Sequence, residues 1–310
     1  MLLGITAITY LAICLTPGGP AAGLMGDFNP KLSPEYRQKQ IKQFHFDRPF
    51  YIQYGYWISN LVHLNFGETA KDNQPVIKKI AERLPRTLLL TGLSLLLSFI
   101  LAVPIGIISA LKHNTWVDRT FTVLVFLGFS VPTYWVALLL MIGLGIHLGW
   151  LPITGYKSIL ADDLNLFGQI WDVLKHLILP MLVTALTGLA SMTRYVRNGM
   201  LEVIRQDYIR TARAKGLPES TVLFKHAFRN TLIPMVTILG LSLPDLISAG
   251  FIFETIFSYP GLGRLGYEAY MTRDVFLIMG VSTLGALLTL VGNLIADVLY
   301  ALVDPRIRYR

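Results

Sequence analysis

Long apolar runs without a charged residue dominate this chain and limit the folds that it can adopt. Four such runs lie at 87–111, 120–156, 177–193 and 275–296. The hydrocarbon core of a bilayer is about 30 Å thick, and a helix needs about 20 residues to cross it. Because lipid offers the backbone no hydrogen-bond partner, such runs cross as helices. The sequence therefore predicts at least four transmembrane helices.

Two further runs raise the expected number of crossings to six. One covers 231–257 and is interrupted by Asp245 and Glu254, and the other covers 1–16 ahead of the breaker Thr-Pro-Gly-Gly-Pro. At about 1.5 Å per residue the run 1–16 reaches only about 24 Å. No basic residue precedes it, whereas a cleaved signal peptide carries a positive segment at its start. We therefore expect a first transmembrane helix that lacks its beginning, in an all-α polytopic membrane protein.

The charged residues indicate which side of the membrane each loop occupies. The chain is 53% hydrophobic and only 15% charged, with a net charge of +8. Six crossings place both termini on one side, together with the loops 111–119 and 194–230, which are rich in Lys and Arg. By the positive-inside rule this side is cytoplasmic, and the long loop 18–86 weighs little. The basic character is thus a signal of topology, and we expect no nucleic-acid partner.

The expected organisation follows from these runs. It comprises transmembrane helix 1 at 1–17, an external, partly helical segment at 18–86, a core at 87–303 that includes a cytoplasmic segment at 200–230, and a cytoplasmic tail at 304–310. In the external segment, four residues recur at helical spacing, which predicts an amphipathic helix: Phe50, Tyr54, Trp57 and Leu61. This helix either lies on the bundle or the membrane interface, or offers a platform to an external partner.

Several kinds of chemistry have no signature here. Cys14 is the only cysteine, and no Gly-Lys dipeptide occurs, so no phosphate loop of the Walker type is present. The six histidines lack the spacing of a zinc site on a helix. We therefore expect no metal or cofactor on this chain and no catalysis by it alone.

The most informative segment is 207–234, which is polar and basic and lies between two apolar runs. An apolar stripe at i, i+3, i+7 and i+11 predicts one helix that runs through Leu201, Ile204, Tyr208 and Ala212. Gly216 is a natural stop for this helix, and Pro218 favours the first turn of a second, short helix. Small residues at Ala212, Ala214 and Gly216 would allow another surface to approach closely. A basic loop in contact with anionic lipid is the alternative that spacing leaves open.

The run 207–216, DYIRTARAKG, resembles the cytoplasmic signature of the permease subunits of dipeptide and oligopeptide ABC importers. The runs PGGP at 17–20, ETIFSYPGLG at 254–263 and DPRIR at 304–308 also resemble the B-type permease of that family. Arg210 and Thr211 depart from the Glu-Ala-Ala-x-x-x-Gly motif of importers in general, whereas Ala212 and Gly216 match it.

The resemblance implies the permease fold of type I importers and a heterodimer with a homologous second permease. It also implies two ABC ATPase subunits that bind ATP and Mg, an external peptide-binding protein, a peptide substrate and a bacterial or archaeal inner membrane as the location. The cargo stays open between a dipeptide, a longer peptide and a nickel chelate. The residues that the resemblance assigns to ATPase coupling are Asp207, Tyr208, Arg210, Ala212, Arg213, Ala214 and Gly216.

Candidates for the substrate pathway are Ser130 and Tyr134, which flank Pro132, and Asp245 within the fifth run. A bend at Pro132 could expose polar groups to a cavity, while a packing kink and internal pairing are the alternatives. The pattern Ala102-x-x-x-Gly106 could seat a close helix contact. An ion-coupled secondary transporter is the competing function, and it requires an internal repeat that the sequence does not show.

Overall fold

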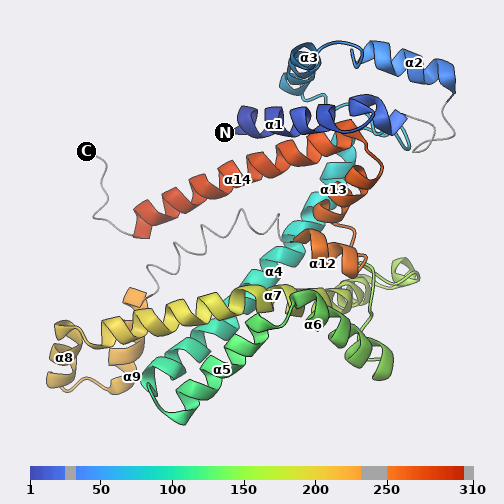
Figure 1. Cartoon of the computed structure of the whole chain (residues 1–310). Coiled ribbons are helices and arrows are strands. Elements are labelled where there is room, and N and C mark those ends of the chain that lie inside the picture. Colours follow the sequence, from blue (N-terminus) through green and yellow to red (C-terminus); the bar gives the residue numbers. More distant parts are fainter. Residues whose placement is uncertain (25–32, 232–249, 304–310) are drawn as a thin grey trace, which may run out of the picture. The chain divides into compact units, whose positions relative to one another are not determined.

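The computed structural model describes residues 1–24, 33–231 and 250–303, and these residues are helical apart from connecting loops (Figure 1). Within them, an isolated bridge between Glu68 and Pro75 is the only strand-like pairing. The predicted all-α class is therefore confirmed. The helical elements are α1 (Leu2–Leu15), η1 (Gly19–Leu24), α2 (Pro34–Gln43), α3 (Phe50–Val62), α4 (Val76–Leu111), α5 (Trp116–Ser130), α6 (Thr133–Leu140), η2 (Met141–His147), η3 (Ala161–Asp163), α7 (Leu166–Ile204), α8 (Asp207–Ala214), α9 (Glu219–Thr221), η4 (Val222–Phe228), α12 (Gly250–Ile256), α13 (Leu262–Met271) and α14 (Val275–Val303).

Three described helices are long and apolar enough to cross a membrane, namely α4, α7 and α14. Helix α1 is apolar but shorter, as expected from the sequence. Most of the expected fifth crossing, including Asp245, lies outside the described residues. The number of six crossings therefore stays a prediction.

The expected third crossing, 120–156, is divided at Pro132. Helix α5 ends at Ser130, Val131 is extended, and α6 begins after Pro132. The proline ring disfavours a helical conformation for the residue before it, which explains the extended backbone of Val131. Helix α7, by contrast, continues through Pro180. The bend considered at Pro132 is thus a full break, whereas the helix stays continuous at Pro180.

The chain forms two compact units, and each is described by itself. The first contains 1–88, 247–255 and 260–290, and the second contains 89–246, 256–259 and 291–310. In the first unit the amphipathic helix α3 packs against α1: the Tyr10 hydroxyl donates to Gln53 Oε1 at 3.0 Å, and Trp57 is buried. The predicted amphipathic helix is confirmed, and its apolar stripe covers the chain's own first helix.

Glu254, also in the first unit, is fully buried. Its carboxylate accepts hydrogen bonds from the Thr87 hydroxyl at 2.6 Å and from the backbone N–H of Arg264 at 2.8 Å, in the first turn of α13. The Thr87 hydroxyl in turn accepts from the N–H of Leu262 at 2.7 Å. A helix N-terminus stabilises a carboxylate through its free N–H groups and dipole. A Cβ on Gly261 would overlap this carboxylate, so the glycine is required there.

The second unit is built on a close crossing of α4 and α7. Ala102 is fully buried, and a Cβ on Gly106 would lie 2.5 Å from Cβ of Val196 and 3.0 Å from the Thr193 carbonyl oxygen. The close helix contact predicted from the small residues at Ala102 and Gly106 is therefore confirmed.

Candidate functional site

The sequence predicts a cytoplasmic segment at 200–230, and in the structure residues 205–230 form a protruding helical element, which we call the hook (Figure 1). Helix α7 ends at Ile204, Gln206 is extended, and α8 begins at Asp207. The prediction of one helix through 201–212 is therefore wrong. The change of direction at Gln206 places Ile209, fully buried, on the inner side and leaves Tyr208 43% exposed.

A hydrogen-bonded turn ends α8. The N–H of Gly216 donates to the carbonyl of Arg213 at 2.9 Å, and the N–H of Leu217 donates to the carbonyl of Ala212. This pair of bonds is the Schellman motif, which requires a left-handed residue after the helix. Gly216 has φ +73°, a region that costs other residues free energy. The predicted stop at Gly216 is confirmed, with a conformational reason for the glycine.

The chain then turns back onto the end of α7. Pro218 precedes α9, which continues into the π-helical turn η4. The buried residues of the hook join those of α7 and α4 in one apolar cluster, whose members include Met200, Ile209, Ala212, Val222 and Ala227. The hook is thus packed against a membrane-spanning helix rather than hanging from it as a free loop.

Two polar contacts on the exposed surface of the hook join segments of the hook to one another. Arg213 donates to Glu219 through Nε at 3.1 Å and Nη2 at 2.6 Å, a bidentate pair that joins α8 to α9. Asn230 Nδ2 donates to the Tyr208 hydroxyl at 3.0 Å. The hydrogen bonds from Arg213 hold the pKa of the Glu219 carboxyl below its ordinary value. No local pattern singles out Glu219, because it lies beyond the turn that brings it back to Arg213.

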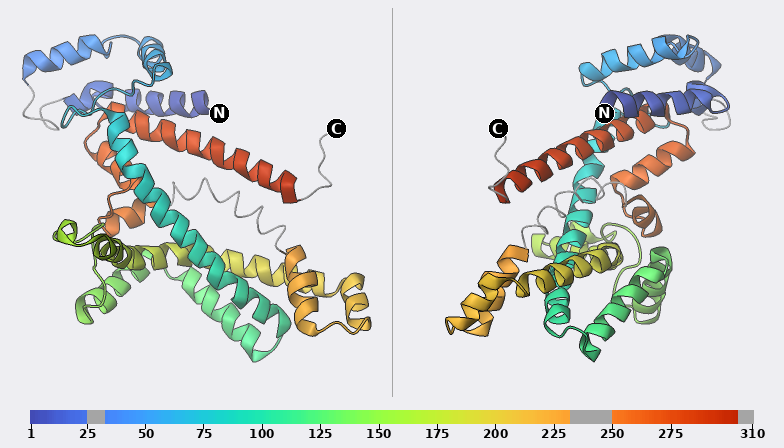
Figure 2. Two further views of the ribbon diagram at one scale, coloured as in Figure 1. Left: turned by 180° about the vertical axis from the view of Figure 1, so that it is seen from behind. Right: turned by 60° about the vertical axis from the view of Figure 1, so that its left-hand side comes forward.

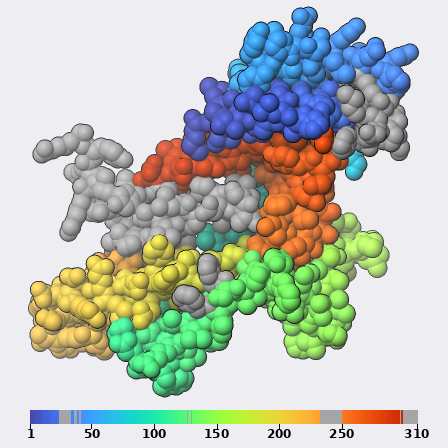
Figure 3. All heavy atoms as spheres, in the orientation of Figure 1, coloured from blue at the N-terminus to red at the C-terminus, as the bar shows by residue number. Residues whose placement is uncertain are grey.

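The structure brings the seven predicted coupling residues together on this element. Six have exposed side chains or backbone, and these are Asp207, Tyr208, Arg210, Arg213, Ala214 and Gly216. Ala212 is only 6% exposed. Of the three small residues, Ala214 and Gly216 are therefore open to another surface, whereas Ala212 serves the packing inside the hook. The hook lies at the end of α7 both in the ribbon views (Figure 2) and in the space-filling view (Figure 3).

The predicted pathway residues lie on other elements. Ser130 ends α5 and Tyr134 lies in the first turn of α6, on either side of the break at Pro132, and both are exposed. Asp245 lies outside the described residues.

A mostly buried ion pair joins the first turn of α5 to α7. Arg197 donates to the carboxylate of Asp118 through Nε and Nη2, both at 2.8 Å. Asp118 also accepts from the Ser109 hydroxyl and from the N–H of Asn114 at 3.0 Å. Its side chain is 4% exposed, and the guanidinium of Arg197 holds the pKa of Asp118 well below its ordinary value. The two partners lie 79 positions apart, so no local spacing predicts the pair.

Comparison with known proteins identifies the family of the chain that carries this hook. Residues 102–309 match the family described as the inner membrane component of binding-protein-dependent transport systems. The chain belongs to this family. The match covers the second unit from residue 102 to residue 309, including the hook, and confirms the family predicted by resemblance.

Relatives in this family match the chain over its full length. It is 42% identical to the oligopeptide transport system permease protein AppB of Bacillus subtilis, covering 100% of this chain and 96% of the relative. It is 34% identical to the dipeptide transport system permease protein DppB of Escherichia coli, covering 99% and 95%. A chain from an inward-facing structure of the MetNI methionine ABC transporter superposes with a TM-score of 0.59 at 18% identity, over 73% of this chain and 96% of that one. The fold is therefore that of an ABC importer permease.

Proposed function

We propose that this chain is a permease subunit of an ATP-driven peptide importer and that its hook is the element that couples it to an ATPase. The family assigns a transport role, and the relatives named above are permeases of oligopeptide and dipeptide systems. These names support a peptide as the cargo of this chain.

The observation that supports the coupling role is the packing of the hook against α7 and α4. Its apolar side is part of the same cluster as Met200 on α7 and Ala102 on α4. The Schellman turn and the Arg213–Glu219 pair fix the angle between α8 and α9. A displacement of the exposed face therefore moves α7, a helix of 39 residues, instead of being absorbed by a flexible loop. A closely packed junction of this kind is displaced as a body.

In this proposal, partner subunits that bind ATP supply the energy for transport. Two ABC ATPases bind ATP and Mg, close on each other, and move the hooks of this chain and of a homologous second permease. The helix bundles then rock, and the cavity between the permeases faces the other side of the membrane. An external peptide-binding protein delivers the peptide. Both termini and the hook lie in the cytoplasm of a bacterial or archaeal cell, in accordance with the positive-inside rule.

The substrate pathway is the least constrained part of the proposal. The break at Pro132 leaves Ser130 and Tyr134 exposed at two helix ends, where a polar backbone and side chains can meet water in a cavity. We retain both residues, together with Asp245, as candidates for contact with the peptide.

The test is to replace Gly216 and follow peptide uptake. Gly216→Trp adds a large side chain to an exposed position and forces a left-handed backbone on it, so uptake should be lost while membrane insertion persists. Gly216→Asn is the matched control, because asparagine tolerates this backbone. Normal peptide uptake by Gly216→Trp would contradict the coupling role. Uptake by this chain alone, driven by a proton or sodium gradient without an ATPase, would favour an ion-coupled transporter instead.

A further inference from the structure

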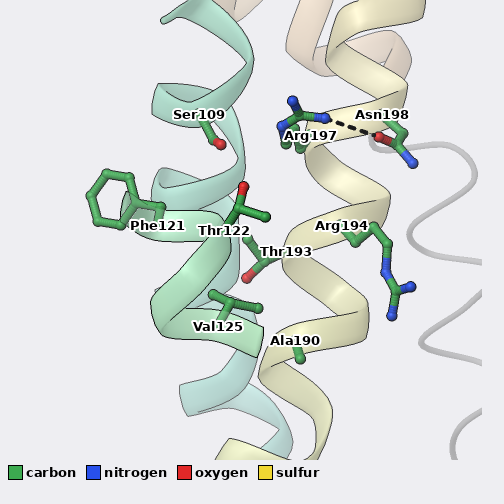
Figure 4. A pocket seen from close by; sticks show the side chains of 9 residues that line it. All are labelled: Ser109, Phe121, Thr122, Val125, Ala190, Thr193, Arg194, Arg197 and Asn198. Atoms are coloured by element: carbon green, nitrogen blue, oxygen red, sulfur yellow. Dashed lines mark hydrogen bonds between the residues drawn. The ribbon is translucent and has the colours of Figure 1, made fainter. Parts of the chain in front are cut away.

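A cavity in the second unit is not explained by the coupling role. It lies between α4, α5 and α7, has a volume of about 320 Å³, and is shown in Figure 4. Pockets of this size that are mainly apolar with a few polar groups are typical ligand sites. The lining residues are Ser109 of α4, Phe121, Thr122 and Val125 of α5, and Ala190, Thr193, Arg194, Arg197 and Asn198 of α7.

One lining group lacks the partner that its burial demands. Thr193 is 5% exposed, and its hydroxyl has no hydrogen-bond partner among the described residues. The hydroxyl is directed toward α5 and the cavity (Figure 4). A buried polar group without a hydrogen bond costs about 1–3 kcal/mol, so a ligand with an acceptor oxygen here is favoured.

The cavity changes character along α7. A second, apolar cavity of about 180 Å³ shares Phe121, Val125 and Ala190 with the first. Its other lining residues are apolar or glycine and extend the space toward the middle of the helices, and they are Ile105, Leu124, Gly128, Leu186 and Leu189. Toward the C-terminal end of α7, the lining becomes polar and cationic.

Two arginines line this polar end, and they differ in whether their guanidinium is already bound by another residue. Arg197 is held by Asp118, as described above. Arg194 is exposed, makes no hydrogen bond or ion pair with the described residues, and lies at the rim with its guanidinium directed away from α5 (Figure 4). In this orientation the guanidinium faces away from the cavity, and a change of rotamer of its long, flexible side chain brings it to an anion at the mouth.

We propose that this cavity binds one anionic phospholipid. The phosphate lies at the rim against Arg194, an ester oxygen accepts the hydrogen bond of Thr193, and an acyl chain fills the apolar cavity between α5 and α7. Basic pockets between transmembrane helices suit anionic head groups in this way. A free phosphate would use the rim alone and leave the apolar cavity empty, and a peptide would not require a single long apolar slot.

The experiment measures retained lipid by native mass spectrometry of the purified transporter complex. The complex is exchanged into equimolar phosphatidylglycerol and phosphatidylcholine of the same acyl chains. Wild type should retain one phosphatidylglycerol per copy of this chain. Arg194→Gln and Thr193→Val should each reduce retention about tenfold, which corresponds to the loss of one hydrogen bond to a charged or buried group.

Matched controls separate this site from general effects. Arg119→Gln removes an exposed arginine that does not line the cavity, and Thr184→Val removes a second buried, unpartnered hydroxyl of α7 outside it. Both should leave retention unchanged. Val125→Phe fills the space shared by the two cavities without altering charge, and should also release the lipid.

Three outcomes would overturn the proposal. Equal retention of the two lipids would remove the role of Arg194. Displacement of phosphatidylglycerol by millimolar inorganic phosphate would indicate a small-anion site, and displacement by a dialanine peptide would indicate a segment of the peptide pathway. Because the measurement counts bound lipid and not uptake, its failure leaves the proposed coupling role intact.

Discussion

Arg213 and Glu219 meet as a bidentate ion pair that spans the turn between α8 and α9, with nitrogen–oxygen distances of 3.1 and 2.6 Å. The two residues lie on either side of Gly216, whose left-handed backbone makes the turn. The pair is exposed, so its contribution is to the geometry of the hook more than to the stability of the fold.

Breaking this pair should weaken transport without unfolding the protein. We expect Glu219→Gln to reduce ATP-dependent peptide uptake in proteoliposomes by up to about fivefold, because an exposed pair is worth up to about 1 kcal/mol. The exchanged pair Arg213→Glu with Glu219→Arg should recover part of the uptake. Lys157→Gln, which breaks an exposed ion pair with Asp162 outside the hook, is the control and should transport normally. Equal uptake by wild type and Glu219→Gln would show that the pair does not set the coupling geometry.

The backbone of Gly216 gives a second prediction. At φ +73° a β-branched residue is strained by about 1–2 kcal/mol, so Gly216→Val should distort the hook and lower the stimulation of ATPase activity by peptide-loaded binding protein. Gly216→Asn adds a side chain of similar size but tolerates the conformation. We expect coupling to follow backbone tolerance, with the asparagine variant much closer to wild type. If both variants coupled equally well, the conformation of this turn would be irrelevant to coupling.

We predict that breaking the Asp118–Arg197 pair lowers the stability of the protein. The pair is mostly buried, so Asp118→Asn should lower the free energy of unfolding by about 2–4 kcal/mol, between the values for exposed and fully buried pairs. The folded-state pKa of Asp118 is lowered by Arg197, so its stabilisation is present above the unfolded pKa and is lost as pH falls through the folded value. The difference between wild type and variant in thermal melts should thus persist from about pH 5 to pH 8. A difference that disappears near neutral pH would contradict this assignment of charges.

We predict that a side chain added at Gly261 causes a packing defect. A methyl group there would overlap the buried carboxylate of Glu254, so Gly261→Ala should destabilise the first unit by about 1–3 kcal/mol. Gly285→Ala is the matched control, because a Cβ at that helical position meets no atom within 4 Å. Thermal melts in detergent should show a loss for the first variant and a neutral or slightly stabilising effect for the second. A wild-type melting temperature for Gly261→Ala would mean that Glu254 is not held against α13 in this way.

The membrane character, the all-α class and the family could all be predicted from the sequence, because apolar runs and a contiguous motif are local signals. The stop at Gly216 and the amphipathic helix around Trp57 were predictable for the same reason. The break at Gln206 was not, since the apolar spacing of Ile204 and Tyr208 fits a continuous helix and only the packing of Ile209 and Ala212 reveals the turn.

Contacts between residues that lie far apart in the sequence could not be predicted either. Asp118 and Arg197 are 79 positions apart, and Thr87 and Glu254 are 167 apart. A charged residue near an apolar run predicts that some partner exists, but the tertiary fold decides which one. The burial of the Thr193 hydroxyl, which has no hydrogen-bond partner in the part of the chain that the structure describes, likewise depends on the tertiary fold and not on a local pattern.

The most direct test of the central claim is site-specific cross-linking from the hook. The sequence offers a simple background, because Cys14 is the only cysteine and can be replaced by serine. In that background Ala214→Cys places one thiol on the exposed side of α8. A short bifunctional reagent applied to inside-out vesicles of cells that express the whole transporter should join this thiol to the ATPase subunit, with a yield that changes when ATP is bound. Labelling of the thiol from the outer side of the membrane only, or no ATPase adduct in the assembled complex, would contradict the account.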